Sequence, residues 1–102
     1  MKHYRQGDLL IEEVAAIPPT AKPRKAAKRL VLAEGEATGH THTIAPSEAR
    51  LLDDAGVTYL EVQEALAMLT HDEHATIELP RGTYRVIRQR EYAPEAPRQV
   101  AD

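Results

Sequence analysis

The chain has 102 residues, which is the length of one small domain and excludes a catalytic domain joined to a separate regulatory domain. Its 13 basic and 16 acidic side chains give a net charge of -3, so the molecule as a whole is not an obvious polyanion binder. It contains no Cys, which excludes disulfides, thiolate nucleophiles, Cys-based zinc fingers and iron–sulfur clusters.

The first half of the chain alternates strand and turn signals. After a turn signal at 7–8, the apolar run 9–14 predicts a strand. Residues 15–28 carry three Pro and a cluster of basic residues, a composition that disfavours helix and ladder and predicts an exposed loop. The segments 29–34 and 40–44 predict two further strands, separated by a turn that Gly residues bracket.

The signals in the middle of the chain are less uniform. Residues 46–52 fit either one helical turn or a loop that runs into a short strand. A turn at 53–56 precedes 57–62, whose alternation predicts a half-buried strand. The stretch 63–70 contains helix-favouring residues but also alternates, and because it is short for a helix we expect a strand.

The C-terminal part predicts a hairpin over 76–92, with its turn at Pro80–Gly82, followed by a polar tail at 93–102. The whole pattern amounts to six to eight short, mostly antiparallel strands with no alternating βα units. We therefore expect an all-β, single-domain barrel or sandwich that spans residues 1–92.

The apolar composition predicts a thin core. The sequence has no Phe and no Trp, and 16 of its hydrophobic residues are Ala. We therefore expect self-association, as a homodimer. No stretch approaches the roughly 18 apolar residues of a membrane span, and the N-terminus lacks the apolar run of a signal peptide. These features predict a soluble, cytoplasmic protein with no membrane partner.

Four of the five His residues form two pairs, His40/His42 and His71/His74. Side chains two apart in a strand share a face, so His40 and His42 are expected to point the same way. His71 and His74 would oppose each other across a ladder if Asp72–Glu73 formed a two-residue loop. A wider loop fits the sequence equally well, and a single helical turn would also place both on one side.

Imidazoles with nearby carboxylates form a donor set suited to divalent Zn, Fe, Mn or Ni. The expected metal ligands are His40, His42, His71 and His74. Glu48 or Glu73 would serve as a further ligand or as a catalytic general base. A metal-bound water with a lowered pKa would make the protein a metal-dependent hydrolase or an oxygenase-like enzyme that acts on a small molecule. The alternative is that the two pairs have unrelated surface or hydrogen-bonding roles.

A resemblance to the cupin barrels rests on the same segment. Their first metal motif has a Gly, then His-x-His, then a Glu and a closing Gly, and the matching residues here are Gly35, His40, His42, Glu48 and Gly56. Four residues separate Gly35 from His40, where the cupin motif has five. Five residues separate His42 from Glu48, where the motif has three or four. Pro80–Gly82 resembles the Pro-x-Gly turn of the second cupin motif.

The family's third His would fall at Arg85, so the resemblance implies a metal-binding β-barrel in which His71 or His74 replaces that ligand. The whole chain also resembles short uncharacterised bacterial proteins that combine a Gly-His-x-His segment with a Tyr-Arg-Val-x-Arg-Gln-Arg-Glu-Tyr ending. This second resemblance implies no activity.

Two basic segments support an alternative function. Their candidate contact residues are Lys22, Arg24, Lys25, Lys28, Arg29, Arg85, Arg88 and Arg90. Alternation in the last strand places Tyr84 on the same face as Arg88, where Arg could bind phosphate and Tyr could stack on bases. The alternative is thus a non-enzymatic module that binds nucleic acid or a protein partner. The same basic segments would also be expected if the last strand carried charges that prevent edge-to-edge aggregation and if the loop 15–28 only increased solubility.

Overall fold

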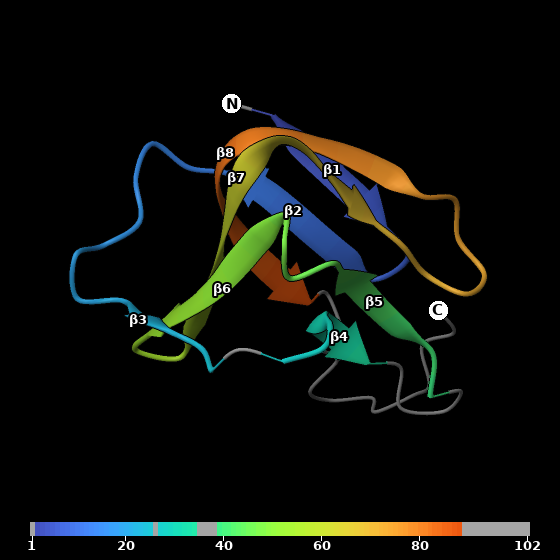
Figure 1. Cartoon of the computed structure of the whole chain (residues 1–102), viewed down its shortest axis with the longest axis horizontal. Coiled ribbons are helices and arrows are strands. Elements are labelled where there is room, and N and C mark those ends of the chain that lie inside the picture. Colours follow the sequence, from blue (N-terminus) through green and yellow to red (C-terminus); the bar gives the residue numbers. More distant parts are fainter. Residues whose placement is uncertain (1, 26, 35–38, 89–102) are drawn as a thin grey trace, which may run out of the picture.

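The structure is a computed structural model that describes residues 2–25, 27–34 and 39–88. In this part of the chain it contains eight strands and no helix (Figure 1), which confirms the predicted all-β class. The strands are β1 (His3–Gln6), β2 (Leu9–Glu13), β3 (Lys22–Pro23), β4 (Leu30–Glu34), β5 (Thr41–Ile44), β6 (Ala49–Asp54), β7 (Val57–Leu69) and β8 (Ile77–Arg88).

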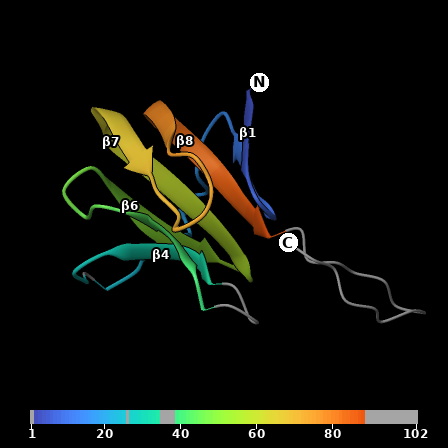
Figure 2. The ribbon, with the colours of Figure 1, turned by 90° about the vertical axis from the view of Figure 1, so that its right-hand side faces the viewer.

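The strands form two antiparallel sheets. The larger sheet has the order β1-β2-β8-β7-β6-β3, and the smaller sheet consists of β4 and β5. The long strands β7 and β8 curve along their length (Figure 1), and the small sheet lies to one side of the large one (Figure 2). Within the described strands the sheets meet only in a bridge between Thr43 and Thr70, so the fold is sandwich-like and not a closed barrel.

The core lies between the two sheets. In β2, Leu9 and Ile11 are both 0% exposed, because alternate side chains of a strand point to the same face. Leu30 of β4 and Ile44 of β5 belong to the same cluster. The buried apolar residues are Leu9, Ile11, Leu30, Ala33, Ile44, Ala49, Leu51, Leu52, Leu60, Val62, Ala67, Leu69, Leu79 and Tyr84.

The ambiguous stretch 63–70 lies almost wholly in strand β7, as expected, but this strand contains a bulge. Val62 pairs with Gly82 and Leu66 pairs with Pro80, so three residues of β7 oppose one residue of β8. The amides of the bulge at positions 63 and 64 both donate hydrogen bonds to the carbonyl oxygen of Glu48, at 3.0 and 3.3 Å. The bulge interrupts simple alternation, which explains the mixed sequence signal.

The prediction of a hairpin turn at Pro80–Gly82 is wrong, because these residues lie inside β8. Pro lacks the N–H group that a regular ladder needs, but it is tolerated at a bulge. Here Pro80 borders the β7 bulge. The turn that reverses the chain is instead the loop 70–76, between β7 and β8.

Several other boundaries differ from the sequence analysis. The segment 15–28, which was predicted to be a loop, contains the short strand β3. Its residues Lys22 and Pro23 pair with β6 at the edge of the large sheet. For 46–52, a turn that leads into a strand is observed. Strand β1 was not anticipated. Residues 89–102, which include the end of the expected last strand and the tail, lie outside the described part.

The turn expected at 53–56 is shorter than predicted. Asp53 and Asp54 pair within the β6–β7 ladder, and Ala55 and Gly56 alone form the loop. Their φ angles are 50° and 82°, as a two-residue type I′ hairpin requires. None of the described segments forms a helix able to cross a membrane.

Candidate metal site

The four His side chains of the two pairs lie together and are called the histidine cluster below. The ring centroids of His42 and His71 are 4.4 Å apart, and those of His71 and His74 are 4.5 Å apart. His40 lies 5.7 Å from His71, and His42 lies 6.4 Å from His74. Two segments about thirty residues apart in sequence therefore converge, through a wide loop and not through a two-residue turn.

The β7–β8 loop is fixed beside β5 by a short ladder. Thr43 and Thr70 exchange two backbone hydrogen bonds, of 3.0 and 2.9 Å, which places His42 next to the start of the loop. Within the loop, the Nδ1 atom of His71 accepts hydrogen bonds from the amides of Glu73 and His74, at 2.9 and 3.3 Å. The loop is thus folded around the His71 ring.

The β1–β2 turn, formed by Gly7 and Asp8, lies directly beneath the cluster. Gly7 has a φ of 62°, and a Cβ atom at this position would lie 2.7 Å from Nε2 of His74. Only Gly allows both this backbone conformation and this close approach. The sequence marked Gly7–Asp8 as a turn, but nothing in it indicated that the turn meets the histidines.

Gln6, the last residue of β1, fixes the orientation of His42. These are the two buried polar side chains in the described part of the chain, with 2% and 3% exposure. The amide nitrogen of Gln6 donates to the carbonyl oxygens of Leu69 and Ala75, at 3.0 and 2.9 Å. Its Oε1 atom is therefore the acceptor from Nδ1 of His42, at 2.8 Å. In the neutral ring, the lone pair consequently lies on Nε2.

The Nε2 atom of His42 faces the carboxylate of Asp8. The distance from Nε2 to Oδ1 is 3.5 Å, while Oδ2 accepts a hydrogen bond of 3.2 Å from Nε of Arg88. Burial lowers the pKa of His42 to about 4, and the neighbouring His71 adds to this effect. Burial and the nearby His74 also lower the pKa of His71. His42 is therefore neutral at pH 7, with its lone pair directed toward a carboxylate.

Two carboxylates of the β7–β8 loop lie near the cluster. Oδ2 of Asp72 is 3.8 Å from Nε2 of His40, and Oε1 of Glu73 is 3.6 Å from its Nδ1. Both acidic side chains are well exposed, at 64% and 67%. Glu73, which was expected to act as a ligand or a base, is thus within reach of the cluster.

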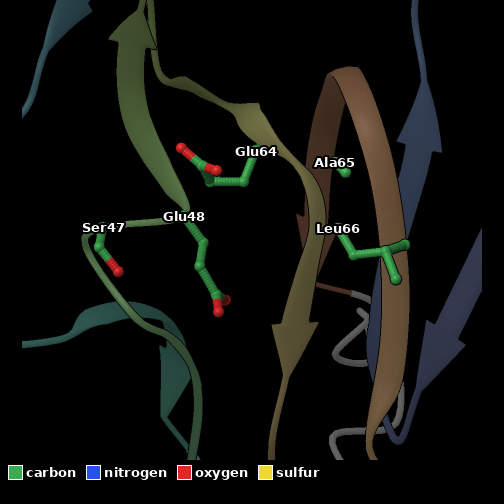
Figure 3. A pocket seen from close by; sticks show the side chains of 5 residues that line it. All are labelled: Ser47, Glu48, Glu64, Ala65 and Leu66. Carbon is green, nitrogen blue, oxygen red and sulfur yellow. The ribbon is translucent and has the colours of Figure 1, made fainter.

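Glu48 makes its contacts at the bulge of β7. Its Oε1 atom accepts a hydrogen bond of 3.0 Å from the amide of Met68. It also lines an open hollow, together with Ser47, Glu64, Ala65 and Leu66 (Figure 3). The described hydrogen bonds of Glu48 are with β7 and with the carbonyl oxygen of Ala45, and none of them involves an imidazole.

The spacing of the rings is close to what one metal ion would require. A ring nitrogen about 2.1 Å from zinc puts the ring centroid about 3.2 Å from the ion, so two rings on a tetrahedral ion lie about 5 Å apart. The observed separations of 4.4, 4.5 and 5.7 Å bracket this value. In their present rotamers, however, no three His, Asp or Glu side chains of the described ranges aim their donor atoms at one point. Because Nδ1 of His71 accepts hydrogen bonds from two amides, its neutral ring carries the proton on Nε2, so ligation through Nδ1 would replace these hydrogen bonds.

Three basic residues of the alternative function bind carboxylates. Arg24 binds Asp53 through two hydrogen bonds of 2.8 Å, Arg85 binds Glu12, and Arg88 binds Asp8. The exposed basic side chains of the first segment are Lys22, Lys25, Lys28 and Arg29, in addition to Arg24.

Arg90 lies outside the described residues. Tyr84, which was expected to share an exposed face with Arg88, is only 3% exposed and belongs to the core. Its ring is therefore not available to stack on a base, and that part of the prediction is wrong.

The fold and the site define a small all-β protein in which a buried Gln–His pair lies beside three partly buried imidazoles. The chain belongs to the family "Domain of unknown function (DUF8820)", which matches residues 5–89. This span includes the whole histidine cluster and the β1–β2 turn. Comparisons with curated proteins and with solved structures gave no match.

Proposed function

We propose that this protein binds a divalent transition metal ion at the histidine cluster. The observation that carries the proposal is the convergence of the two His pairs, with centroid separations of 4.4 to 6.4 Å between rings. Imidazole is the commonest protein ligand for such ions. The three partly buried rings of His40, His71 and His74 gather around the buried ring of His42, and the apolar core cluster is built from other residues.

The buried Gln6–His42 pair supports the proposal. A buried polar side chain costs free energy unless its hydrogen bonds are made, and an apolar pair would fill the same space without this requirement. The pair instead presents one nitrogen, Nε2 of His42, toward the other imidazoles and Asp8. A metal-binding His commonly donates its second N–H to a fixed acceptor, and Gln6 supplies that acceptor here.

The donor set suggests which ions bind. Imidazole and carboxylate donors without thiolates suit Zn, Mn, Fe or Ni in the divalent state and disfavour soft ions such as Cu(I). When bound, an ion with an open position would supply a water of lowered pKa or a site for a small oxygen-donor ligand. His40, with Asp72 and Glu73 beside it, lies where it could accept a proton from such a ligand.

Elemental analysis and zinc titration of protein purified without an affinity tag test the proposal. We expect one ion per chain and micromolar or tighter affinity for the wild type. His42→Ala and His71→Ala should each weaken binding at least about 10-fold, since each removes one ligand. His3→Ala is the matched control, because His3 contacts Glu12 at 3.2 Å, outside the cluster, and should bind like wild type. A wild-type protein that binds none of these ions would refute the proposal.

A further inference from the structure

We propose that Asp8 supplies a carboxylate ligand to this ion, beside the Nε2 nitrogen of His42. The inference rests on the proposed metal site and adds a ligand that neither the His-x-His segment nor the loop 70–76 contains. Asp8 follows Gly7 in the β1–β2 turn, and its side chain is 15% exposed. It is thus held from an element distant in sequence from both His pairs.

The distance between the two atoms indicates a shared ion. Nε2 of His42 and Oδ1 of Asp8 are 3.5 Å apart. This contact is not a hydrogen bond, because the proton of the neutral His42 ring is on Nδ1, where Gln6 accepts the hydrogen bond. Two ligands about 2.1 Å from one tetrahedral ion are separated by about 3.4 Å. The observed separation therefore matches two neighbouring ligands better than it matches a hydrogen-bonded pair.

The hydrogen bonds around both groups leave the facing atoms available. Oε1 of Gln6 accepts a hydrogen bond from the N–H group at Nδ1, so the lone pair of a neutral His42 lies on Nε2. Arg88 donates to Oδ2 of Asp8, at 3.2 Å, and also to the carbonyl oxygen of Glu34. Because Arg88 is held at both ends, it orients the carboxylate with Oδ1 toward His42. Metal-ligating carboxylates are commonly fixed by such a second hydrogen bond.

Asp8 fits the role of ligand better than the acidic residues of the loop. The side chains of Asp72 and Glu73 are 64% and 67% exposed, so ordering them on an ion has a larger entropic cost. Asp8 is already ordered by Arg88. A carboxylate added to imidazoles also favours divalent zinc, manganese, iron or nickel over softer ions, which narrows the expected specificity.

The test compares zinc affinity in Asp8→Asn and Glu12→Gln, measured by competition with a chromophoric chelator. Glu12→Gln is the matched control because it also removes a carboxylate paired with an arginine, Arg85, on the same pair of strands. We expect Asp8→Asn to weaken zinc binding at least about 10-fold and Glu12→Gln to leave it within about 3-fold. Equal affinities in the two variants would overturn the inference.

A third variant separates ligation from folding. Arg88→Met removes the ion pair that orients the carboxylate but keeps the carboxylate itself, so it should weaken zinc binding less than Asp8→Asn does. A loss in Arg88→Met that exceeds the loss in Asp8→Asn would show that Arg88 matters for a reason other than orienting a ligand, and would overturn the inference. Backbone amide spectra check that each variant is folded.

The wild type distinguishes the two proposals from each other. If wild-type protein binds no zinc, the proposed function fails. If it binds zinc and Asp8→Asn binds equally well, only the role of Asp8 fails. Long-range ¹H–¹⁵N spectra of the His rings add a direct readout, because zinc-free His42 should carry its proton on Nδ1. A proton on Nε2 instead would contradict the assigned ligand atom.

Discussion

Acidification of the metal-free protein should reduce its stability through His42. The ring is 3% exposed, and burial holds its pKa at about 4, below the ordinary value of 6.5. Above pH 6.5 both the folded and the unfolded chain carry a neutral ring, so the full stability is present. As the pH falls from 6.5 to 4, the unfolded chain gains a proton that the folded chain does not accept. Stability therefore decreases across this window.

The magnitude follows from the difference between the two pKa values. A difference of about 2.5 pH units corresponds to about 3 kcal/mol when it is fully developed, of which about 2 kcal/mol falls between pH 7 and pH 5. His71 contributes in the same direction, because its pKa is also lowered. The paired carboxylates of Asp53 and Glu12 have lowered pKa values and titrate at lower pH, so the window above pH 5 isolates the histidines.

Urea denaturation in the presence of a chelator, followed by circular dichroism at several pH values, measures this effect. His42→Asn is the informative variant, because its side-chain amide can still donate a hydrogen bond toward Gln6 but does not titrate. The variant should lose about 2 kcal/mol less than wild type between pH 7 and pH 5. Parallel pH dependences for the two proteins would refute the assignment of a depressed pKa to His42.

Three further substitutions test the local structure by urea denaturation. Gly7→Ala should destabilise the fold by about 1 to 2 kcal/mol more than Gly56→Ala does. Both residues have positive φ, but of the two only Gly7 contacts the ring of His74. Equal losses of stability in the two variants would contradict that close packing. Ala55→Asn should stabilise the protein by about 0.5 to 1 kcal/mol, since Asn tolerates the positive φ of this hairpin position, and a loss of stability would argue against the type I′ turn. Leu60→Ala should cost about 2 to 5 kcal/mol, because Leu60 is 0% exposed, whereas a cost below 1 kcal/mol would place it outside the core.

Local alternation was enough to predict most of the fold. The β-branched and apolar residues of Thr41–Ile44 and Leu30–Glu34 mark those strands without any long-range information. Alternation failed where a distant partner determines the backbone. Pro80–Gly82 resembles a turn in isolation, but the bulge of the neighbouring strand lets these residues continue a ladder. Nothing near position 80 in the sequence contains this information.

The candidate site could be predicted only in part, for the same reason. The His-x-His and His-x-x-His spacings identified the imidazoles, whereas their convergence depends on the Thr43–Thr70 bridge. Gln6 and Asp8 carry no sequence signal, since Gln6 meets its partners 36 to 69 residues away. The hydrogen bonds that fix the tautomer of His42 join β1, β5 and the end of β7 with its following loop, so they become visible only in the folded structure.

The separation of site and core indicates what a bound ion does for this protein. Zinc fingers unfold without metal because ligation supplies most of their folding free energy. In the described part of this chain, 14 buried apolar residues form the core without a contribution from the histidines. The metal-free chain should therefore stay folded, and an ion at 100 times its dissociation constant would add only about 2.7 kcal/mol. A metal-free protein that unfolds cooperatively in urea would confirm this expectation, whereas one that is unfolded without metal would contradict it.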